Sequence, residues 1–422
     1  MDYWFLDPML KALFPLALST TVKGLSTVFS TPTLIMGSNV FPEGPVLGAS
    51  TVDMWGARCE KKRAFIVTDE AAERFARRVA KTAEGGGFAT ETWNKVLPEP
   101  PLENVKECGE VMTAFEPDLI VAVGGGSVMD GAKAAWIHYE RPDIEYLGAL
   151  SPLETLGLRK KAIFAAVPTT SGTGSECTPV SVVTDAAAHR KIPLANADLL
   201  PDFAILDPAF TVTMPPWLTV GTGLDALSHA TDTMAIVSSN EITDALALAA
   251  IEMTFKYLPR AYVDGRDREA RLRMHIAAST AGMAFGANST ALTHSFGHSL
   301  GGLFKVHHGL ACGVFIPYTF QFYNKTSDKF LGIARALRVE ADTKEETLNN
   351  LVERFRVFYK ELDIPLNLKD LGIPKDEFEE KMDQLVLYAL EDISTFFSPR
   401  PMTKAQCEEI FRYAYEGKDI NF

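Results

Sequence analysis

One segment of the chain concentrates residues that can bind a metal. Six of the eight histidines lie between His229 and His308. Asp225 and His229 are four residues apart, and so are His294 and His298. On a helix, this spacing places both side chains of a pair on the same face. A carboxylate and several neutral imidazoles suit a divalent first-row metal, so the pattern predicts a metal site.

The alternative is that these histidines belong to an ordinary core. A single histidine on an apolar helix is more often a core residue with satisfied ring nitrogens. Two pairs of metal-binding residue types, followed by His307 and His308, are hard to explain in that way. The segment is also rich in Ala, Gly and Ser, which offer few other partners for an imidazole. We therefore favour the metal site. The donor types suit both Fe²⁺ and Zn²⁺, and the general order of affinities favours zinc.

Composition limits the classes of protein to consider. The 422 residues suffice for two or three domains, and 47% apolar and 23% charged residues are typical of a soluble globular protein. The net charge of −13 argues against nucleic acid or an anionic membrane as partner. The sequence contains no run of about 20 apolar residues, so no membrane span is predicted. The five scattered cysteines, none in a CxxC pair, indicate reduced thiols and a cytoplasmic protein.

The first half of the chain alternates between two kinds of segment. The strands that we expect are 64–68, a short one starting at 91, 118–123, 162–167, 180–184 and 203–206. The helices that we expect between them are 70–83, 105–115 and 128–139. Because short apolar runs alternate with helices, the pattern predicts an open, mostly parallel α/β sheet.

After residue 207 the strand-like runs stop and Ala, Leu and Met dominate. The helices that we expect there are 216–236, 240–260, 267–287, 289–302, 309–323, 326–337, 343–362, 374–390 and 403–416. The sequence therefore predicts an α/β domain at 1–207 and a helical domain at 208–422. Residues 1–25 form an N-terminal extension, in which 4–18 read as an amphipathic helix packed on the body or on a second subunit. This apolar segment indicates a homo-oligomer, a dimer or larger.

Two glycine-rich turns follow predicted strands and could hold a nucleotide. Gly124-Gly125-Gly126-Ser127 leads into a helix, where glycines let the backbone approach a phosphate and helix amides face it. The turn fits neither standard nucleotide motif, so an ordinary strand–helix turn is an equal alternative. The second turn, at 168–175, offers the hydroxyls of Thr169, Thr170 and Thr173. Two such turns on neighbouring parallel strands form a crevice for a nucleotide.

Asp69 ends an earlier strand and bears on the choice of cofactor. Its carboxylate could accept hydrogen bonds from a ribose 2′-hydroxyl, and its charge would repel a 2′-phosphate. This favours NAD over NADP. Asp69 could equally cap the following helix, and that role does not exclude the first.

Four ordered motifs resemble the iron-dependent (group III) alcohol dehydrogenase family over roughly residues 30–420. They are GGGSVMD at 124–130, PTTSGTGSE at 168–176, GLDALSHA at 223–230 and HSFGHSLGG at 294–302, and His308-Gly309 matches a family His-Gly pair. The resemblance implies a dinucleotide-binding α/β domain followed by a helical domain. It implies Asp225, His229, His294 and His308 as metal ligands, with His298 beside the nicotinamide instead.

The resemblance also implies cofactor and substrate residues. Those at the pyrophosphate turn are Gly125, Gly126, Ser127 and Asp130, and those at the second cofactor turn are Thr169, Thr170 and Thr173. Lys191 matches a basic residue near the adenosine half, and Phe285 an aromatic residue of the substrate pocket. Two positions depart from the family: His307 stands where proline is usual, and Val180 where some members carry a polar side chain, which makes the pocket more apolar.

The function that the resemblance implies is hydride transfer between a primary alcohol and NAD⁺ on a Lewis-acid metal. We expect iron on the resemblance alone, a small or medium apolar alcohol or its aldehyde as substrate, and His298 as the proton relay. The alternatives are a zinc polyol dehydrogenase resembling the glycerol enzymes, a zinc- and NAD-dependent cyclase resembling dehydroquinate synthase, and a scaffold protein with a vestigial site. Lys305 is the only basic residue between His275 and Lys325, which counts against a phosphorylated cyclase substrate.

Overall fold

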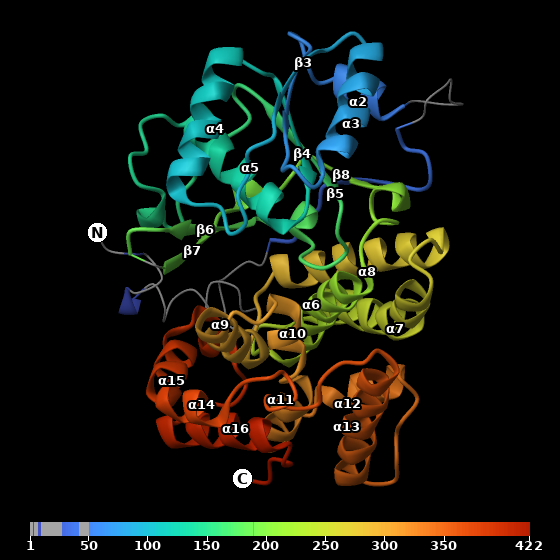
Figure 1. The fold of residues 1–422 in the computed structure, drawn as a ribbon, viewed down its shortest axis with the longest axis vertical. Coiled ribbons are helices and arrows are strands. Elements are labelled where there is room, and N and C mark those ends of the chain that lie inside the picture. Colours follow the sequence, from blue (N-terminus) through green and yellow to red (C-terminus); the bar gives the residue numbers. More distant parts are fainter. Residues whose placement is uncertain (1–2, 4–6, 10–27, 42–49, 189) are drawn as a thin grey trace. The chain divides into compact units, whose positions relative to one another are not determined.

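The computed structural model describes residues 3, 7–9, 28–41, 50–188 and 190–422. The chain divides into two compact units, with the boundary between Thr213 and Met214 (Figure 1). Unit 1 contains Ser30–Thr213 and unit 2 contains Met214–Phe422. Apart from residues 7–9, the helix predicted for 4–18 lies outside the described residues, so the subunit contact inferred from it stays a prediction.

Unit 1 is built on a parallel sheet of six strands in the order β1-β8-β5-β4-β2-β3. Its strands are β1 (Thr33–Met36), β2 (Arg63–Val67), β3 (Ala89–Trp93), β4 (Leu119–Gly124), β5 (Ile163–Pro168) and β8 (Phe203–Leu206). A separate antiparallel hairpin consists of β6 (Val180–Asp185) and β7 (Arg190–Ala195). The predicted mostly parallel α/β sheet is confirmed.

Helices cover both faces of this sheet (Figure 1). They are α2 (Thr51–Gly56), α3 (Glu73–Gly85), α4 (Leu102–Phe115) and α5 (Gly126–Glu140). Side chains alternate along β2, so Ala64 and Ile66 pack with residues of α2 and α3, whereas Phe65 contacts Phe115 of α4. Every residue of β4 is buried, as expected for a central parallel strand.

Three elements of unit 1 were not predicted. β7 contains Pro193, which has no amide donor and argues against a strand, but a two-stranded hairpin tolerates it on an outer edge. β1 has only four residues and lies at the edge of the sheet, beside β8, so it is too short to show a clear period. The six-residue helix α2 is likewise too short to show a helical period.

Unit 2 is helical, and among its described residues there is no strand. Its helices are α6 (Pro216–Ala235), α7 (Glu241–Val263), α8 (Arg268–Gly286), α9 (Leu292–Phe304), α10 (His308–Gly313), α11 (Ile316–Tyr323), α12 (Phe330–Ala336), α13 (Lys344–Glu361), α14 (Lys375–Glu380), α15 (Met382–Glu391) and α16 (Lys404–Glu416). Two predicted helices are each split. The one at 309–323 is interrupted before Pro317, which cannot continue the backbone hydrogen bonds, and the one at 374–390 is interrupted at Lys381.

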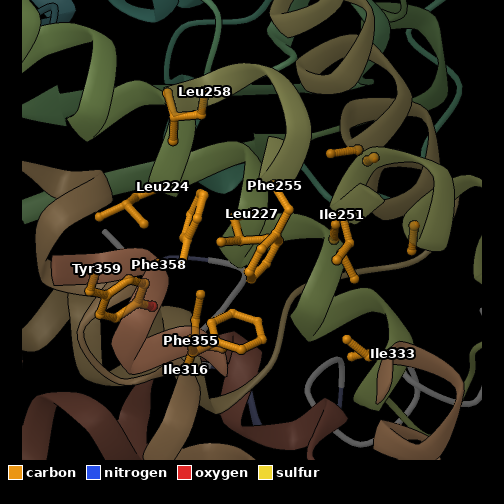
Figure 2. Close-up of a cluster of buried hydrophobic side chains, with 14 of the residues drawn as sticks. Leu224, Leu227, Ile251, Phe255, Leu258, Ile316, Ile333, Phe355, Phe358 and Tyr359 are labelled. Atoms are coloured by element: carbon orange, nitrogen blue, oxygen red, sulfur yellow. The ribbon is translucent and has the colours of Figure 1, made fainter. Parts of the chain in front are cut away.

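Helix α6 lies at the centre of unit 2, and all its residues from Thr219 to Ala235 are buried. Its Leu224 and Leu227 belong to a large apolar cluster with Phe255 of α7 and Phe358 of α13 (Figure 2). The last two rings are stacked with centroids 4.2 Å apart. This packing fixes α6, and therefore the polar residues that the same helix carries. No described helix is long and apolar enough to cross a membrane.

Candidate active site

The four predicted metal ligands converge in unit 2. Asp225 and His229 lie one turn apart on α6, and His294 lies in the first turn of α9. Each offers a donor atom, and these three atoms all lie within 4.8 Å of one another. His308, at the start of α10, joins them with its Nε2 3.3 Å from Asp225 Oδ1. Side chains from three helices therefore surround one point.

A close approach of two helices brings His308 to this point. Gly309 follows it in α10, and a Cβ atom at Gly309 would lie 1.9 Å from the carbonyl oxygen of Gly221 in α6. Any larger residue would push α10 away from α6 and carry the imidazole of His308 away from Asp225. The glycine of the His308-Gly309 pair is therefore required by packing.

Asp232, also on α6, orients His294. Its Oδ2 accepts a hydrogen bond from His294 Nδ1 at 2.8 Å and from the amide of Ala291 at 2.8 Å. It therefore caps the start of α9 and leaves His294 Nε2 free to bind a metal, as in the usual second-sphere arrangement of a histidine ligand. Sequence reasoning missed Asp232, although it lies two turns after Asp225 on the same face of α6.

The electrostatics of the cluster suit a cation. Burial lowers the pKa of His229 to about 3, although Asp225 opposes this, and burial also lowers the pKa of His308. Burial would raise the pKa of Asp225, but the histidines around it bring that pKa below its usual range. At neutral pH the carboxylate of Asp225 is therefore charged, and the imidazoles of His229 and His308 are neutral. Within the described residues, Asp225 Oδ1 and His294 Nε2 are buried without a hydrogen-bond partner, and a divalent metal would satisfy both.

Two aromatic rings border the cluster. Phe285 of α8 stacks on His229, with ring centroids 4.2 Å apart and an angle of 17°, which is consistent with its expected place at the substrate pocket. His298 lies one turn after His294 on α9 and stacks on His308 at 5.3 Å and 15°. Its Nδ1 lies 2.7 Å from Asp392 Oδ2, a contact that the sequence did not predict.

Two further side chains lie near the cluster. His307 packs edge-on against Trp217, with centroids 6.0 Å apart, and is not among the metal-binding groups found in the described residues. Cys312 is buried, and its Sγ lies 3.7 Å from His308 Nδ1. Cys312 forms a second possible donor group with His294 and His308.

The two glycine-rich turns of unit 1 contact each other. The amide of Thr169 donates to the carbonyl of Gly124 at 2.9 Å, and a Cβ atom at Gly126 would lie 2.7 Å from Thr173 Cγ2. Gly125 is the N-cap of α5, and glycine has no side chain that could occupy the first amides of the helix. The arrangement fits a phosphate group at the start of α5.

Two charged side chains of α5, Lys133 and Asp130, hold the segment at the end of the second turn. Lys133 of α5 is fully buried. Its ammonium donates at 2.6 to 2.8 Å to three backbone carbonyls, those of Ser175, Thr178 and Val180. Asp130 accepts from the Ser175 hydroxyl at 2.8 Å with one oxygen and from the Val182 amide at 3.0 Å with the other. In this structure, therefore, Asp130, which was expected at the cofactor, uses one oxygen to hold the end of the second turn and the other to hold strand β6.

The remaining expected cofactor residues also have protein partners. Asp69 Oδ1 accepts from the Ala72 amide at 2.7 Å and so closes the turn before α3. Ala72 itself is the N-cap of α3 and no side chain caps that helix, so the capping role expected of Asp69 is not found. Lys191 pairs with Glu99 at 2.6 Å. The amide of Glu99 donates to Ser127 Oγ at 3.3 Å, which brings Lys191 close to the first glycine-rich turn.

Comparisons with known proteins identify the family. The model described as "Iron-containing alcohol dehydrogenase" matches residues 42–208. The model described as "Fe-containing alcohol dehydrogenase family, C-terminal" matches residues 219–415. The NADPH-dependent butanol dehydrogenase of Clostridium saccharobutylicum is 39% identical over 337 residues, which cover 80% of this chain and 86% of that protein. This chain belongs to the iron-containing alcohol dehydrogenase family.

Solved structures agree with this membership. A 1,3-propanediol oxidoreductase superposes with a TM-score of 0.84 at 28% identity, covering 92% of this alcohol dehydrogenase and 100% of that chain. A sulfoacetaldehyde reductase from Bifidobacterium kashiwanohense, solved with NAD⁺, gives a TM-score of 0.81 at 26% identity, covering 93% and 99%. The fold and the family are therefore those that the motifs predicted.

Membership also fixes the class of reaction. This protein is an alcohol dehydrogenase, and the polyol dehydrogenase and cyclase alternatives are not favoured. Some relatives are longer: the bifunctional aldehyde-alcohol dehydrogenase AdhE of Escherichia coli K12 is 34% identical over 85% of this chain, which corresponds to 43% of AdhE. The chain thus spans less than half of that bifunctional enzyme.

Proposed function

We propose that this alcohol dehydrogenase interconverts a primary alcohol and its aldehyde with NAD(H) and Fe²⁺. The observation that carries the proposal is the convergence of Asp225, His229, His294 and His308, two of which contribute a buried acceptor atom that a metal would satisfy. One carboxylate and three imidazoles serve iron and zinc alike, so the preference for iron rests on the family.

The residues around these cofactors have separate roles. The bound metal supplies Lewis-acid polarisation of the substrate oxygen, and the nicotinamide supplies the hydride acceptor. Phe285 keeps water from one face of His229 and offers the alcohol an apolar contact. His298, whose side chain is 41% exposed, accepts the hydroxyl proton and releases it to solvent. The apolar side chains of Phe285 and Val180, both expected at the substrate pocket, favour a small or medium apolar alcohol.

The preference for NAD rests on Asp69. One of its oxygens is held by the Ala72 amide, so the carboxylate has a fixed position at the end of β2. Its charge favours a ribose 2′-hydroxyl and opposes a 2′-phosphate. The butanol dehydrogenase is named NADPH-dependent, whereas the sulfoacetaldehyde reductase was solved with NAD⁺, so relatives support either cofactor. The residues proposed to bind NAD are Asp69, Gly125, Gly126, Ser127, Asp130, Thr169, Thr170, Thr173 and Lys191.

Metal reconstitution tests the proposal directly. Protein purified without oxygen and stripped of metal would be reloaded with Fe²⁺ or Zn²⁺. NADH formation would then be followed with n-butanol, 1,3-propanediol, glycerol and a hydroxy acid. We expect metal-dependent NADH formation that is fastest with a primary alcohol and Fe²⁺, and slower with NADP⁺. Stoichiometric metal without any alcohol-dependent NADH or NADPH formation would contradict the proposal.

A further inference from the structure

A buried carboxylate outside the metal cluster contacts the proposed proton relay. Asp392 follows α15, and its Oδ2 lies 2.7 Å from His298 Nδ1. The side chain of Asp392 is 16% exposed, whereas that of His298 is 41% exposed. The histidine therefore reaches solvent, while its partner is held inside the protein.

The segment that carries Asp392 is tied to α9 independently of His298. Asp392 Oδ1 accepts from the amide of Ser394 at 2.8 Å. The Thr395 hydroxyl donates to Ser295 Oγ of α9 at 2.8 Å, and the hydroxyls of Ser394 and Thr290 are hydrogen-bonded at 2.8 Å. Because these bonds fix the segment against α9, the carboxylate has a defined position relative to the imidazole.

This contact selects one form of the imidazole. Burial would raise the pKa of Asp392, but His298 and the Ser394 amide lower it to about 2, so its carboxylate is charged at neutral pH. A charged carboxylate can only accept, so Nδ1 of His298 must carry the proton and Nε2 is left as the acceptor. Stacking on His308 holds the plane of the same ring. A free imidazole would have both tautomers and many orientations.

We propose that Asp392 is a positioning residue for alcohol oxidation, which holds His298 in the orientation and tautomer that accept the substrate proton. The inference rests on the relay role proposed above for His298. The hydroxyl proton of the alcohol passes to His298 Nε2 while the hydride passes to NAD⁺, and the imidazolium then loses a proton to water. Asp392 keeps Nδ1 protonated throughout and remains a carboxylate, as in other acid–histidine pairs that orient a base.

A double-mutant cycle tests this inference in the metal-loaded full chain. His298→Ala, Asp392→Asn and the double variant would be compared for kcat with n-butanol and NAD⁺, for bound iron and for the Kd of NAD⁺. Asparagine can still accept from the Ser394 amide, so the turn is preserved. We expect each single variant to lower kcat by roughly 10- to 100-fold at unchanged iron content and NAD⁺ affinity. The double variant should be no slower than His298→Ala alone, because Asp392 acts only through that ring.

The possible failures are distinguishable. If Asp392→Asn lowers kcat by the same factor with and without His298, Asp392 has a structural role and the inference is wrong, although the relay survives. If His298→Ala leaves kcat unchanged, the relay itself is wrong, and the inference falls with it. Asp383→Asn is the matched control, since Asp383 lies on α15 with a side chain that is 91% exposed, and it should not change kcat.

A second variant covers the case in which Asp392→Asn does not fold. Asp392→Glu keeps the carboxylate on a longer side chain and should retain more activity than asparagine would. Any remaining loss in kcat should disappear in the His298→Ala background, whereas an undiminished loss there would overturn the inference.

Discussion

The candidate metal site of unit 2 and the two glycine-rich turns of unit 1 differ in the atoms that would bind a ligand: side-chain atoms in the first, backbone atoms in the second. In the cluster, the chemistry resides in side chains: Asp225 and His294 each present a buried acceptor atom. In the turns, it resides in backbone amides and in the space that Gly126 leaves beside Thr173. The two regions should therefore fail in opposite ways, since a substitution in the cluster removes a donor and one in the turns adds an obstructing atom.

The largest effect is expected for His294→Ala. The variant removes one metal ligand, so we expect loss of bound metal and a fall in kcat/KM of about a thousandfold or more, since a metal supplies several kcal/mol. NAD⁺ affinity should not change. Metal analysis, NADH formation and NAD⁺ titration check the three quantities, with His138→Ala as a control outside the cluster. Full metal occupancy in His294→Ala would contradict the proposed ligand set.

Asp232→Asn should weaken metal binding less severely. The amide has one oxygen in place of two, and it accepts from His294 Nδ1 less strongly than the carboxylate does. We expect the Kd for Fe²⁺ or Zn²⁺ to rise by roughly 10- to 100-fold, the usual range for second-sphere partners. Competition with a chelator measures it. An unchanged Kd would show that the Asp232–His294 hydrogen bond does not tune the ligand.

Gly126→Ala should damage the other region. The added Cβ would lie 2.7 Å from Thr173 Cγ2, so the turns must separate, and we expect NAD⁺ affinity to fall by roughly tenfold to thirtyfold, since overpacking costs about 1–3 kcal/mol. Metal content should not change. Thr173→Ser removes the clashing methyl group and keeps the hydroxyl, so it should restore part of the affinity. Gly85→Ala, with open space around the new Cβ, is the control, and a similar loss there would refute the steric explanation.

The smallest effect concerns the choice of cofactor. Asp69→Ser removes the charge but keeps an oxygen for the Ala72 amide, so α3 should keep its start. We expect the ratio of kcat/KM with NADP⁺ to that with NAD⁺ to rise about tenfold, which corresponds to about 1.4 kcal/mol. Steady-state kinetics with both cofactors measures the ratio. A constant ratio would mean that Asp69 serves only to close the turn before α3.

The contrast between side-chain and backbone chemistry also explains which features could be predicted from the sequence. Pairs such as Asp225 with His229 were predictable because both members lie on one helix, and residue identity carries the chemistry. The central strand β4 was predictable because its apolar run is continuous. The four-residue strand β1 and the strand β7, which contains Pro193, gave no such signal.

Contacts between segments that lie far apart in the sequence could not be predicted from it. Asp392 is 94 positions from His298, so no spacing links them. Asp130 matched a cofactor motif, yet its oxygens bind Ser175 and Val182. The sequence around Lys133 does not distinguish it from an exposed lysine on a helix, so its burial could not be predicted. Each of these roles depends on which segments pack together, and local patterns do not encode that information.

The buried ammonium of Lys133 limits how this enzyme can be recombined with its relatives. Lys133 lies on α5, but the carbonyls to which it donates hydrogen bonds belong to the segment from Ser175 to Val180. A chimaera whose incoming segment follows a different backbone path would leave the ammonium without acceptors, and one whose incoming α5 lacks this lysine would leave buried carbonyls without a donor. The smallest exchangeable module therefore runs from β4 to β6, and protein engineers who shuffle cofactor specificity should place their crossovers outside it.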